Sequence, residues 1–231
     1  MKPRTLLIGL TLAAIVFGVV RARSLRAALP VFDPTDEAIA AYAVYRVPAQ
    51  DEILFGGAGP DDAQALWETS DIIVQASPTG RREAFESEAL SEVEVTAVWK
   101  AGRGVTPGEK VFVYEPVFIS PPAYRPPHVR SRGVNMLMQA DRSYILCLRF
   151  YEKPEGYRYR EAELRTYLLA FPACGIFPLR DPMSVFFLTP RDEPGPSYAE
   201  VRPYDCLAEN EVEFQAFSAL REDLFVRLGL R

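Results

Sequence analysis

The clearest alternation of charged and apolar residues in the chain runs through residues 91–100. Its apolar face comprises Val93, Val95, Ala97 and Trp99. Its polar face comprises Glu92, Glu94, Thr96 and Lys100, with Val98 as an apolar exception between them. Because successive side chains of a strand point to opposite faces, this period of two predicts a half-buried β-strand. The polar face is our candidate partner surface.

A hairpin is expected to join this strand to the next one. The residues that follow it include four turn formers, Gly102, Gly104, Pro107 and Gly108. Residues 109–115 then return as the partner strand. Further strands are predicted over residues 70–77, 143–151 and 163–171, with a last short pair over 175–178 and 184–188. Residues 143–151 are apolar on both faces as far as Leu148, which is typical of a central strand covered from both sides.

Two stretches between the strands are predicted to be loops. Residues 78–88 are polar and charged, which favours a solvated hairpin rim. The acids in that stretch, Glu83, Glu86 and Glu88, lack the spacing of a calcium loop. Residues 116–127 contain five prolines without PxxP spacing, which indicates a stiff crossover loop.

Helix signals occur at both ends of this β-rich region. Asp33 before Pro34 has the signature of a helix start, and we expect that helix to run to about Tyr45 or Arg46. A short helix is predicted over residues 60–68. The clearest helix of all begins at Leu207 or Ala208. Its apolar residues follow a three-four rhythm at Phe214, Phe217, Leu220, Leu224 and Leu228. Packing on the β domain is the expected role of this helix, and an interfacial or partner-binding helix is the alternative.

The amino-terminal pattern predicts a membrane segment. Residues 5–20 are uncharged and strongly apolar, and they end at Arg21. Sixteen helical residues cover about 24 Å, which is shorter than a hydrocarbon core of roughly 30 Å. Either the flanking arginines extend toward the interface or the span also includes residues 22–25. A cleaved signal peptide is the alternative, but the arginines around Ala22 and Ser24 disfavour a cleavage site. We therefore expect an uncleaved signal anchor.

These patterns predict three segments and one folded domain. Residues 1–26 form the transmembrane anchor with basic flanks, residues 27–59 a helix and linker, and residues 60–231 a β domain with its C-terminal helix. At 231 residues and 48% hydrophobic content, the chain can bury a substantial core. The 20 prolines fit a domain of strands and irregular loops better than a helical bundle.

Charge and cysteine usage exclude several classes of protein. The net charge of −5 disfavours a nucleic-acid partner, because phosphate binding requires a concentrated excess of Lys and Arg. The three cysteines form no CxxC motif, so a zinc site has little support. Cys147 lies inside an apolar strand and is expected to be a buried thiol. Cys174 and Cys206 lie in turn-like contexts and are our candidate disulfide if the domain lies outside the cytoplasm.

No catalytic apparatus is recognisable in the sequence. His128 is the single histidine, it lies beside the proline-rich loop, and no GxSxG elbow accompanies it, which disfavours a Ser-His-Asp triad. The glycines at 56–59 and 102–108 do not lead into a phosphate-binding lysine and hydroxyl pair. We therefore predict no catalytic residue, no metal and no cofactor.

The order of the predicted elements resembles that of exported or membrane-anchored bacterial domains of unknown function. The resemblance rests on four stretches, over residues 70–74, 93–100, 110–113 and 144–148, together with the terminal helix. Those domains are similar to OB-fold barrels of the tissue-inhibitor and netrin-module kind, so the resemblance implies an α+β, mainly β fold with a small OB-like barrel. The chain departs from their pattern at Ala101 and Asp141, and it lacks the cysteine-led terminus by which tissue inhibitors grip proteases.

The expected function is that of a membrane-anchored binding or interaction module with an unidentified protein partner. The resemblance favours an extracytoplasmic domain, whereas the arginines after residue 20 favour a cytoplasmic one by the positive-inside rule. We expect the extracytoplasmic orientation. The alternatives are a hydrolase with an unrecognised site and a structural component of an envelope complex.

Overall fold

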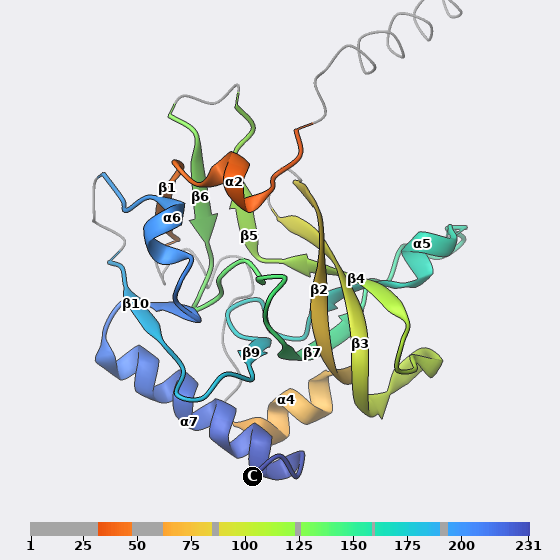
Figure 1. Ribbon diagram of the computed structural model, residues 1–231. Helices are drawn as coiled ribbons and strands as arrows, with labels where there is room; N and C mark the ends of the chain where they lie inside the picture. Colours follow the sequence, from red (N-terminus) through yellow and green to blue (C-terminus); the bar gives the residue numbers. More distant parts are fainter. Residues whose placement is uncertain (1–31, 48–61, 85–87, 123–125, 159, 190–193) are drawn as a thin grey trace, which may run out of the picture. The chain divides into compact units, whose positions relative to one another are not determined.

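The computed structural model describes residues 32–47, 62–84, 88–122, 126–158, 160–189 and 194–231 (Figure 1). Contacts divide the chain into two units, Met1–Phe32 and Asp33–Arg231, and the second unit contains nearly all of the described residues. The predicted anchor at residues 5–20 lies outside the described residues. Within the described ranges, no helix has both the length and the apolar character needed to cross a membrane.

Five strands close into a β-barrel. They are β2 (Ile72–Ala84), β3 (Ala89–Ala101), β4 (Lys110–Glu115), β7 (Tyr144–Phe150) and β8 (Thr166–Leu169). Their order is β2–β3–β4–β8–β7, and β2 also pairs with β7, which closes the ring. The β4–β8 pair is parallel and the other pairs are antiparallel. The short strand β9 (Ile176–Pro178) adds to β7. This arrangement is compatible with an OB-like fold, so the predicted small barrel is confirmed.

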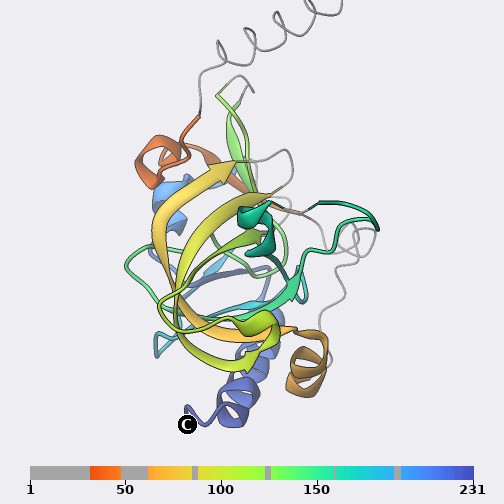
Figure 2. The same cartoon turned by 90° about the vertical axis from the view of Figure 1, so that its right-hand side faces the viewer.

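Apolar side chains fill the barrel and also cover part of its outside. The inner core includes Val74, Val93, Val113, Leu146 and Tyr167. The outer core lies against α4 (Ala63–Thr69) and α7 (Glu211–Arg227), and it includes Ile73, Ile145, Cys147, Phe177 and Phe217. Strand β7 contributes to both cores through alternate residues. The prediction of a central strand covered on both sides is therefore confirmed. Figure 2 shows the curved ribbon of β2 and β3 with α4 and α7 at its lower end.

Two bulges change the alternation of β3. Val74 pairs with Val98 and Ile73 with Lys100, so Trp99 is an extra residue in β3, and Thr96 is a second one. Each extra residue reverses the faces of the residues beyond it. Val98 consequently packs against the inner core, whereas Trp99 packs in the outer core. The prediction that Trp99 shares a face with Val93 is wrong for this reason.

The β2–β3 hairpin is longer than the charge pattern indicated. Residues 78–84 belong to β2, and the pairing of the two strands continues to Ala84 opposite Ala89. The expected loop over residues 78–88 is thus mostly strand. The β-propensity of these polar residues is low, but side-chain partners at the end of the barrel stabilise their pairing with β3. Arg82 is the clearest of these, since its guanidinium lies among buried acceptors.

The segment after Asp33 is the largest departure from the predicted elements. Thr35, rather than Asp33, caps a four-residue helix α2 (Asp36–Ile39), and β1 (Ala43–Arg46) follows it. Strand β1 pairs in parallel with β6 (His128–Ser131), which pairs with β5 (Val117–Ile119). The proline-rich stretch over residues 116–127 therefore contains one strand of a second sheet, β5, and leads into another, β6, so the prediction that all of it is a loop is wrong. A long helix over residues 33–46 is wrong because this pairing outweighs the local helix signal.

The last part of the chain forms a third, two-stranded sheet and the terminal helix. Strand β10 (Val185–Phe187) pairs in parallel with β11 (Cys206–Ala208), and not with β9 as predicted. Helices α5 (Glu161–Leu164) and α6 (Tyr198–Val201) are single turns, as is the 3-10 turn η1 (Gly102–Gly104). Asn210 caps α7 by accepting from the Glu213 N–H at 3.0 Å.

Helix α7 packs on the barrel as expected. The ring of Phe217 stacks on Phe177 with centroids 5.3 Å apart, and the Trp99 indole N–H donates to the Leu228 carbonyl at 2.9 Å. These contacts tie the helix to β9 and to the barrel strand β3. The predicted packing of this helix on the β domain is therefore confirmed.

Replacing Phe217 by alanine should destabilise the domain by about 3–5 kcal/mol, because the change leaves a cavity against Phe177. Phe217 is 5% exposed, whereas Val226 on the same helix is 63% exposed. Val226→Ala should therefore change the free energy of unfolding by less than about 0.5 kcal/mol. Urea unfolding followed by tryptophan fluorescence measures both. Equal effects of the two changes would contradict the packing described for α7.

Candidate functional site

A buried carboxylate anchors the polar cluster at one end of the barrel. Glu115, the last residue of β4, is completely buried. Its Oε2 accepts from the Met138 N–H at 2.6 Å, and its Oε1 accepts from the Ser91 hydroxyl and lies 3.6 Å from Arg82 Nε. Burial raises the pKa of Glu115, although Arg82 and the two hydrogen bonds act in the opposite direction. The carboxylate is held at a place where water does not solvate it.

Arg82 connects this carboxylate to the segment that precedes the barrel. Its Nη2 donates to the Met138 carbonyl at 2.6 Å, and its Nη1 lies 3.2 Å from Asp36 Oδ1 in α2. Burial alone would lower the pKa of Arg82, but the neighbouring Glu115, Tyr198 and Asp36 raise it above its ordinary value. The guanidinium therefore remains charged and bridges two carboxylates.

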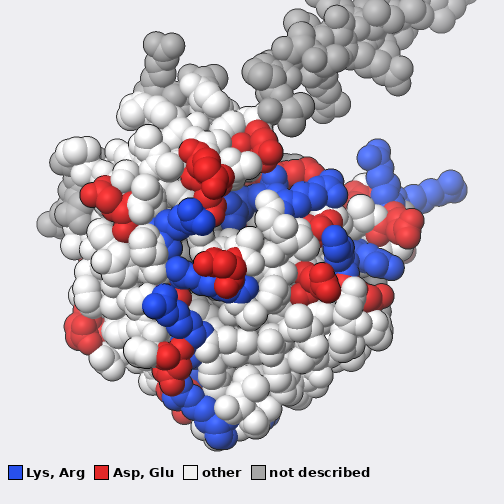
Figure 3. Space-filling model, viewed as in Figure 1, with Lys and Arg blue, Asp and Glu red and all other residues white. Residues whose placement is uncertain are grey.

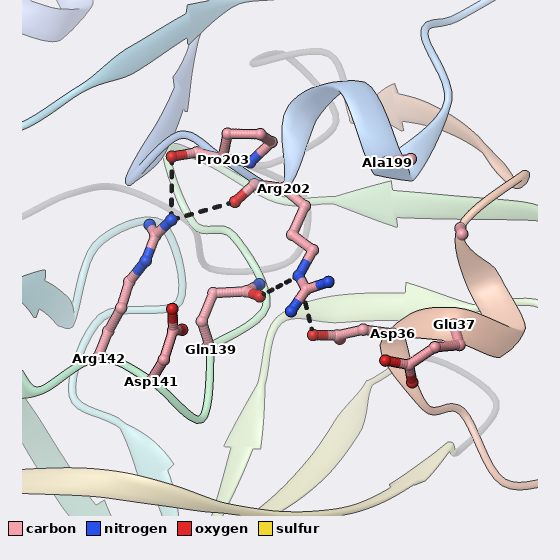
Figure 4. A pocket seen from close by; sticks show the side chains of 9 residues that line it. Asp36, Glu37, Gln139, Asp141, Arg142, Ala199, Arg202 and Pro203 are labelled. Atoms are coloured by element: carbon pink, nitrogen blue, oxygen red, sulfur yellow. Dashed lines mark hydrogen bonds and ion pairs between the residues drawn. The ribbon is translucent and has the colours of Figure 1, made fainter.

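Asp36 also belongs to a closed ring of four polar side chains. Arg202 Nε lies 3.2 Å from Asp36 Oδ2 and donates to Gln139 Oε1 at 2.9 Å. Gln139 Nε2 donates to the Tyr198 hydroxyl at 3.0 Å, and that hydroxyl donates to Asp36 Oδ1 at 3.2 Å. The ring joins α2, α6 and the loop before β7, and Figure 4 shows three of its members, Asp36, Gln139 and Arg202.

The ring lies beside a surface hollow of about 380 Å³. The residues that line the hollow are Asp36, Glu37, Ala40, Gln139, Asp141, Arg142, Ala199, Arg202 and Pro203. On the face drawn in Figure 3, Lys and Arg side chains form a band that is interleaved with acidic ones. Charged groups of both signs therefore surround the hollow, whereas apolar side chains fill the barrel.

Arg142 is part of the wall of the hollow and is fully engaged. Its Nη1 donates to Asp205 Oδ1 at 2.8 Å and to the Tyr204 carbonyl at 2.9 Å. Its Nη2 donates to the carbonyls of Arg202 and Pro203. These bonds fix the turn that carries Arg202 and leave Arg142 little capacity to bind anything else.

Three other charged groups of the hollow, on Arg202, Glu37 and Asp141, can still form hydrogen bonds with a ligand. Among the described residues, none hydrogen-bonds to Nη1 or Nη2 of Arg202, and none to the carboxylates of Glu37 and Asp141. Arg202 is 45% exposed, and the two acids are exposed as well. Figure 4 shows the Arg202 guanidinium beside Gln139 and Asp36, with Asp141 on the far side of Gln139 and Glu37 on the far side of Asp36. The arrangement can offer donors and acceptors to one small ligand.

The four residues of the candidate partner surface do not form one free polar face. The Glu92 carboxylate is buried and accepts from the Thr79 hydroxyl and from Lys110. Lys100 donates to the carbonyls of Trp67 and Ser70 at the end of α4. Glu94 and Thr96 are exposed. A partner contact through this face stays a prediction.

The remaining sequence candidates lie away from the hollow. His128 lies in β6 with its ring 5.9 Å from that of Tyr45 and 5.5 Å from that of Phe118, and it does not line the hollow. All three cysteines are buried, and burial raises the pKa of Cys147 and of Cys206 to about 12. The pairing of Cys174 with Cys206 stays a prediction. Within the described ranges, no group of three or more His, Cys, Asp or Glu residues could hold a metal ion.

Sequence patterns did not point to the residues of the hollow. Asp36, Gln139 and Arg202 come from three segments more than 60 residues apart, and each lies in a short loop or single-turn helix. Their only local signal is the acidic start of α2. Comparisons with protein-family models, with curated proteins and with solved structures give no match for this chain.

Glu115→Ala should destabilise the domain by about 3–5 kcal/mol, because it leaves Arg82 buried without one of its carboxylates. Glu83→Ala is the matched control on the neighbouring hairpin. Its side chain is 54% exposed and pairs with an exposed arginine, so its loss should cost less than about 1 kcal/mol. Chemical unfolding of both variants measures the difference. A cost below 1 kcal/mol for Glu115→Ala would contradict the role of the pair.

The raised pKa of Glu115 predicts the sign of a pH effect. The folded state holds this proton more tightly than the unfolded state, so the contribution of Glu115 to stability falls as the pH rises above its ordinary value of 4.5. As the pH rises above 4.5, the free energy of unfolding of the wild-type chain relative to that of Glu115→Gln should decrease by up to about 1.4 kcal/mol per pH unit. Unfolding titrations at several pH values measure it, and an increase with pH would show that the pKa is lowered instead.

Proposed function

We propose that the chain is a membrane-anchored, extracytoplasmic binding module that takes its ligand in the hollow beside the barrel. The observation that carries this proposal is the contrast between a barrel interior packed with apolar side chains and a hollow with exposed charged groups that no described residue engages. A filled barrel offers no chamber for a substrate, whereas a concave polar site at the junction of several elements is a usual place for recognition.

The anchor and the orientation rest on the sequence. Residues 5–20 are apolar and uncharged, as a signal anchor requires, and the barrel topology is compatible with the OB-like exported domains that the chain resembles. A binding role fits the hollow better than a histidine-dependent hydrolase does, because His128, the single histidine of the chain, does not line it.

Reporter fusions to the C-terminus test the location of the domain. Alkaline phosphatase, which needs the oxidising side of the membrane, should be active when fused after Arg231, and β-galactosidase fused at the same place should be inactive. An inactive phosphatase together with an active β-galactosidase would overturn the extracytoplasmic orientation.

Site-specific photocrosslinking in whole cells tests binding at the hollow. A photoreactive side chain at Ala199, which is exposed and lines the hollow, should yield a covalent adduct that mass spectrometry detects on the purified protein. The same side chain at Ala216, an exposed alanine on α7, is the matched control and should yield none. Adducts at neither site, or equally at both, would overturn the placement of the binding site.

A further inference from the structure

We infer that the hollow recognises an α-amino acid group, with the carboxylate on Arg202 and the ammonium on Asp141 or Glu37, and that it prefers a basic amino acid. This inference rests on the proposed function of the hollow and specifies the class of ligand. It follows from three properties of the site, namely its free donors, its charge balance and its size.

The free donors belong to Arg202. Its Nε is fixed by Gln139 at 2.9 Å and by Asp36 at 3.2 Å, which orients the guanidinium, while Nη1 and Nη2 make no hydrogen bond with a described residue. Two parallel N–H groups of a held guanidinium match the two oxygens of a carboxylate. Binding such a group costs little ordering entropy, because the ring around Asp36 already holds the arginine in place.

The charge balance of the site calls for a cation as well. Three arginines pair with three acids in and around the hollow, as Arg82 with Glu115, Arg202 with Asp36, and Arg142 with Asp205. Glu37 and Asp141 remain without an arginine partner among the described residues. A simple anion would be repelled by these acids, and a simple cation would leave the Arg202 donors unsatisfied. A group with both charges satisfies both requirements.

The presence of two acids without an arginine partner, Glu37 and Asp141, also predicts a preference among amino acids. One acid suffices for an α-ammonium, so the second is available to a basic side chain. Lysine should therefore bind more tightly than alanine, and glutamate more weakly. The volume of about 380 Å³ is at the small end of ligand sites, which fits a single amino acid or a very short peptide better than a larger molecule.

Calorimetric titration of the full chain in detergent at low ionic strength tests this inference. L-Lysine and L-alanine should bind, lysine up to about fivefold more tightly, since an exposed ion pair contributes at most about 1 kcal/mol. Propionate and ethylammonium, which each carry one of the two charges, should not bind. Binding of propionate as tight as that of alanine, or no binding of either amino acid, would overturn the inference. Alanyl-alanine distinguishes a free amino acid from a short peptide as the ligand, because it binds as tightly as alanine only if the hollow accepts peptides.

Variants assign the two halves of the ligand. Asp141→Asn and Glu37→Gln should not change stability, because these carboxylates have no described partner, and together they should remove the preference for lysine over alanine. Glu94→Gln, an exposed acid on β3, is the matched control and should leave that preference unchanged. Arg202→Gln should weaken both amino acids at least about tenfold, since it loses a bidentate charge-assisted contact. Its unfolding midpoint shows whether the ring survives, and unchanged affinity would contradict the assignment.

The outcomes separate this inference from the proposed function. An adduct at Ala199 without binding of any amino acid would leave the binding module in place and overturn the ligand class. Amino-acid binding together with an inactive phosphatase fusion would uphold the ligand class and overturn the extracytoplasmic location.

Discussion

The burial of the Glu115 carboxylate is the constraint on which the rest of the site depends. Closing β4 between β3 and β8 places this group out of water, where a charge without partners is too costly to keep. Arg82, Ser91 and the Met138 N–H compensate for that cost, and Arg82 can do so only because β2 continues as strand beyond the apolar part of the barrel. The length of the hairpin and the burial of the acid therefore explain each other.

The same arginine determines how the amino-terminal part of the unit is attached. Arg82 holds Asp36, Asp36 holds Arg202, and Tyr198 and Gln139 close the ring, so α2 and α6 are positioned by one polar network. A separate ion pair holds β1, because Arg46 donates to both carboxylate oxygens of Glu213 in α7. Polar pairs thus act together with buried apolar side chains, such as Ile39, Val44 and Val201, to position the irregular segments around the barrel. The hollow lies among α2, α6 and the loop before β7. Such networks specify one geometry because a partly satisfied alternative costs more.

Strong local periodicity made the central elements predictable from sequence. Three patterns predicted burial correctly, namely the alternation up to Val95, the strand β7 with two apolar faces, and the three-four spacing in α7. They did so because apolar residues recur at the period of the strand or helix that buries one of its faces. Prediction failed where a partner from elsewhere in the chain changed the outcome. Residues 43–46 pair with β6 as a strand instead of continuing the helix predicted from Asp33. The charged stretch after Ser77 forms a strand instead of a loop, because Arg82 finds buried partners there.

The sequence by itself determined that this is a mainly β domain with a packed terminal helix, because those features follow from neighbouring residues. It could not determine which face Trp99 occupies, since two bulges in β3 depend on the register with β2. Nor could it assign Lys100, which looked like a free surface charge and instead binds the carbonyls at the end of α4. The hollow was decided by the tertiary structure alone. Asp36, Gln139 and Arg202 are distant in sequence, and only the closed barrel and its polar network bring them to one place.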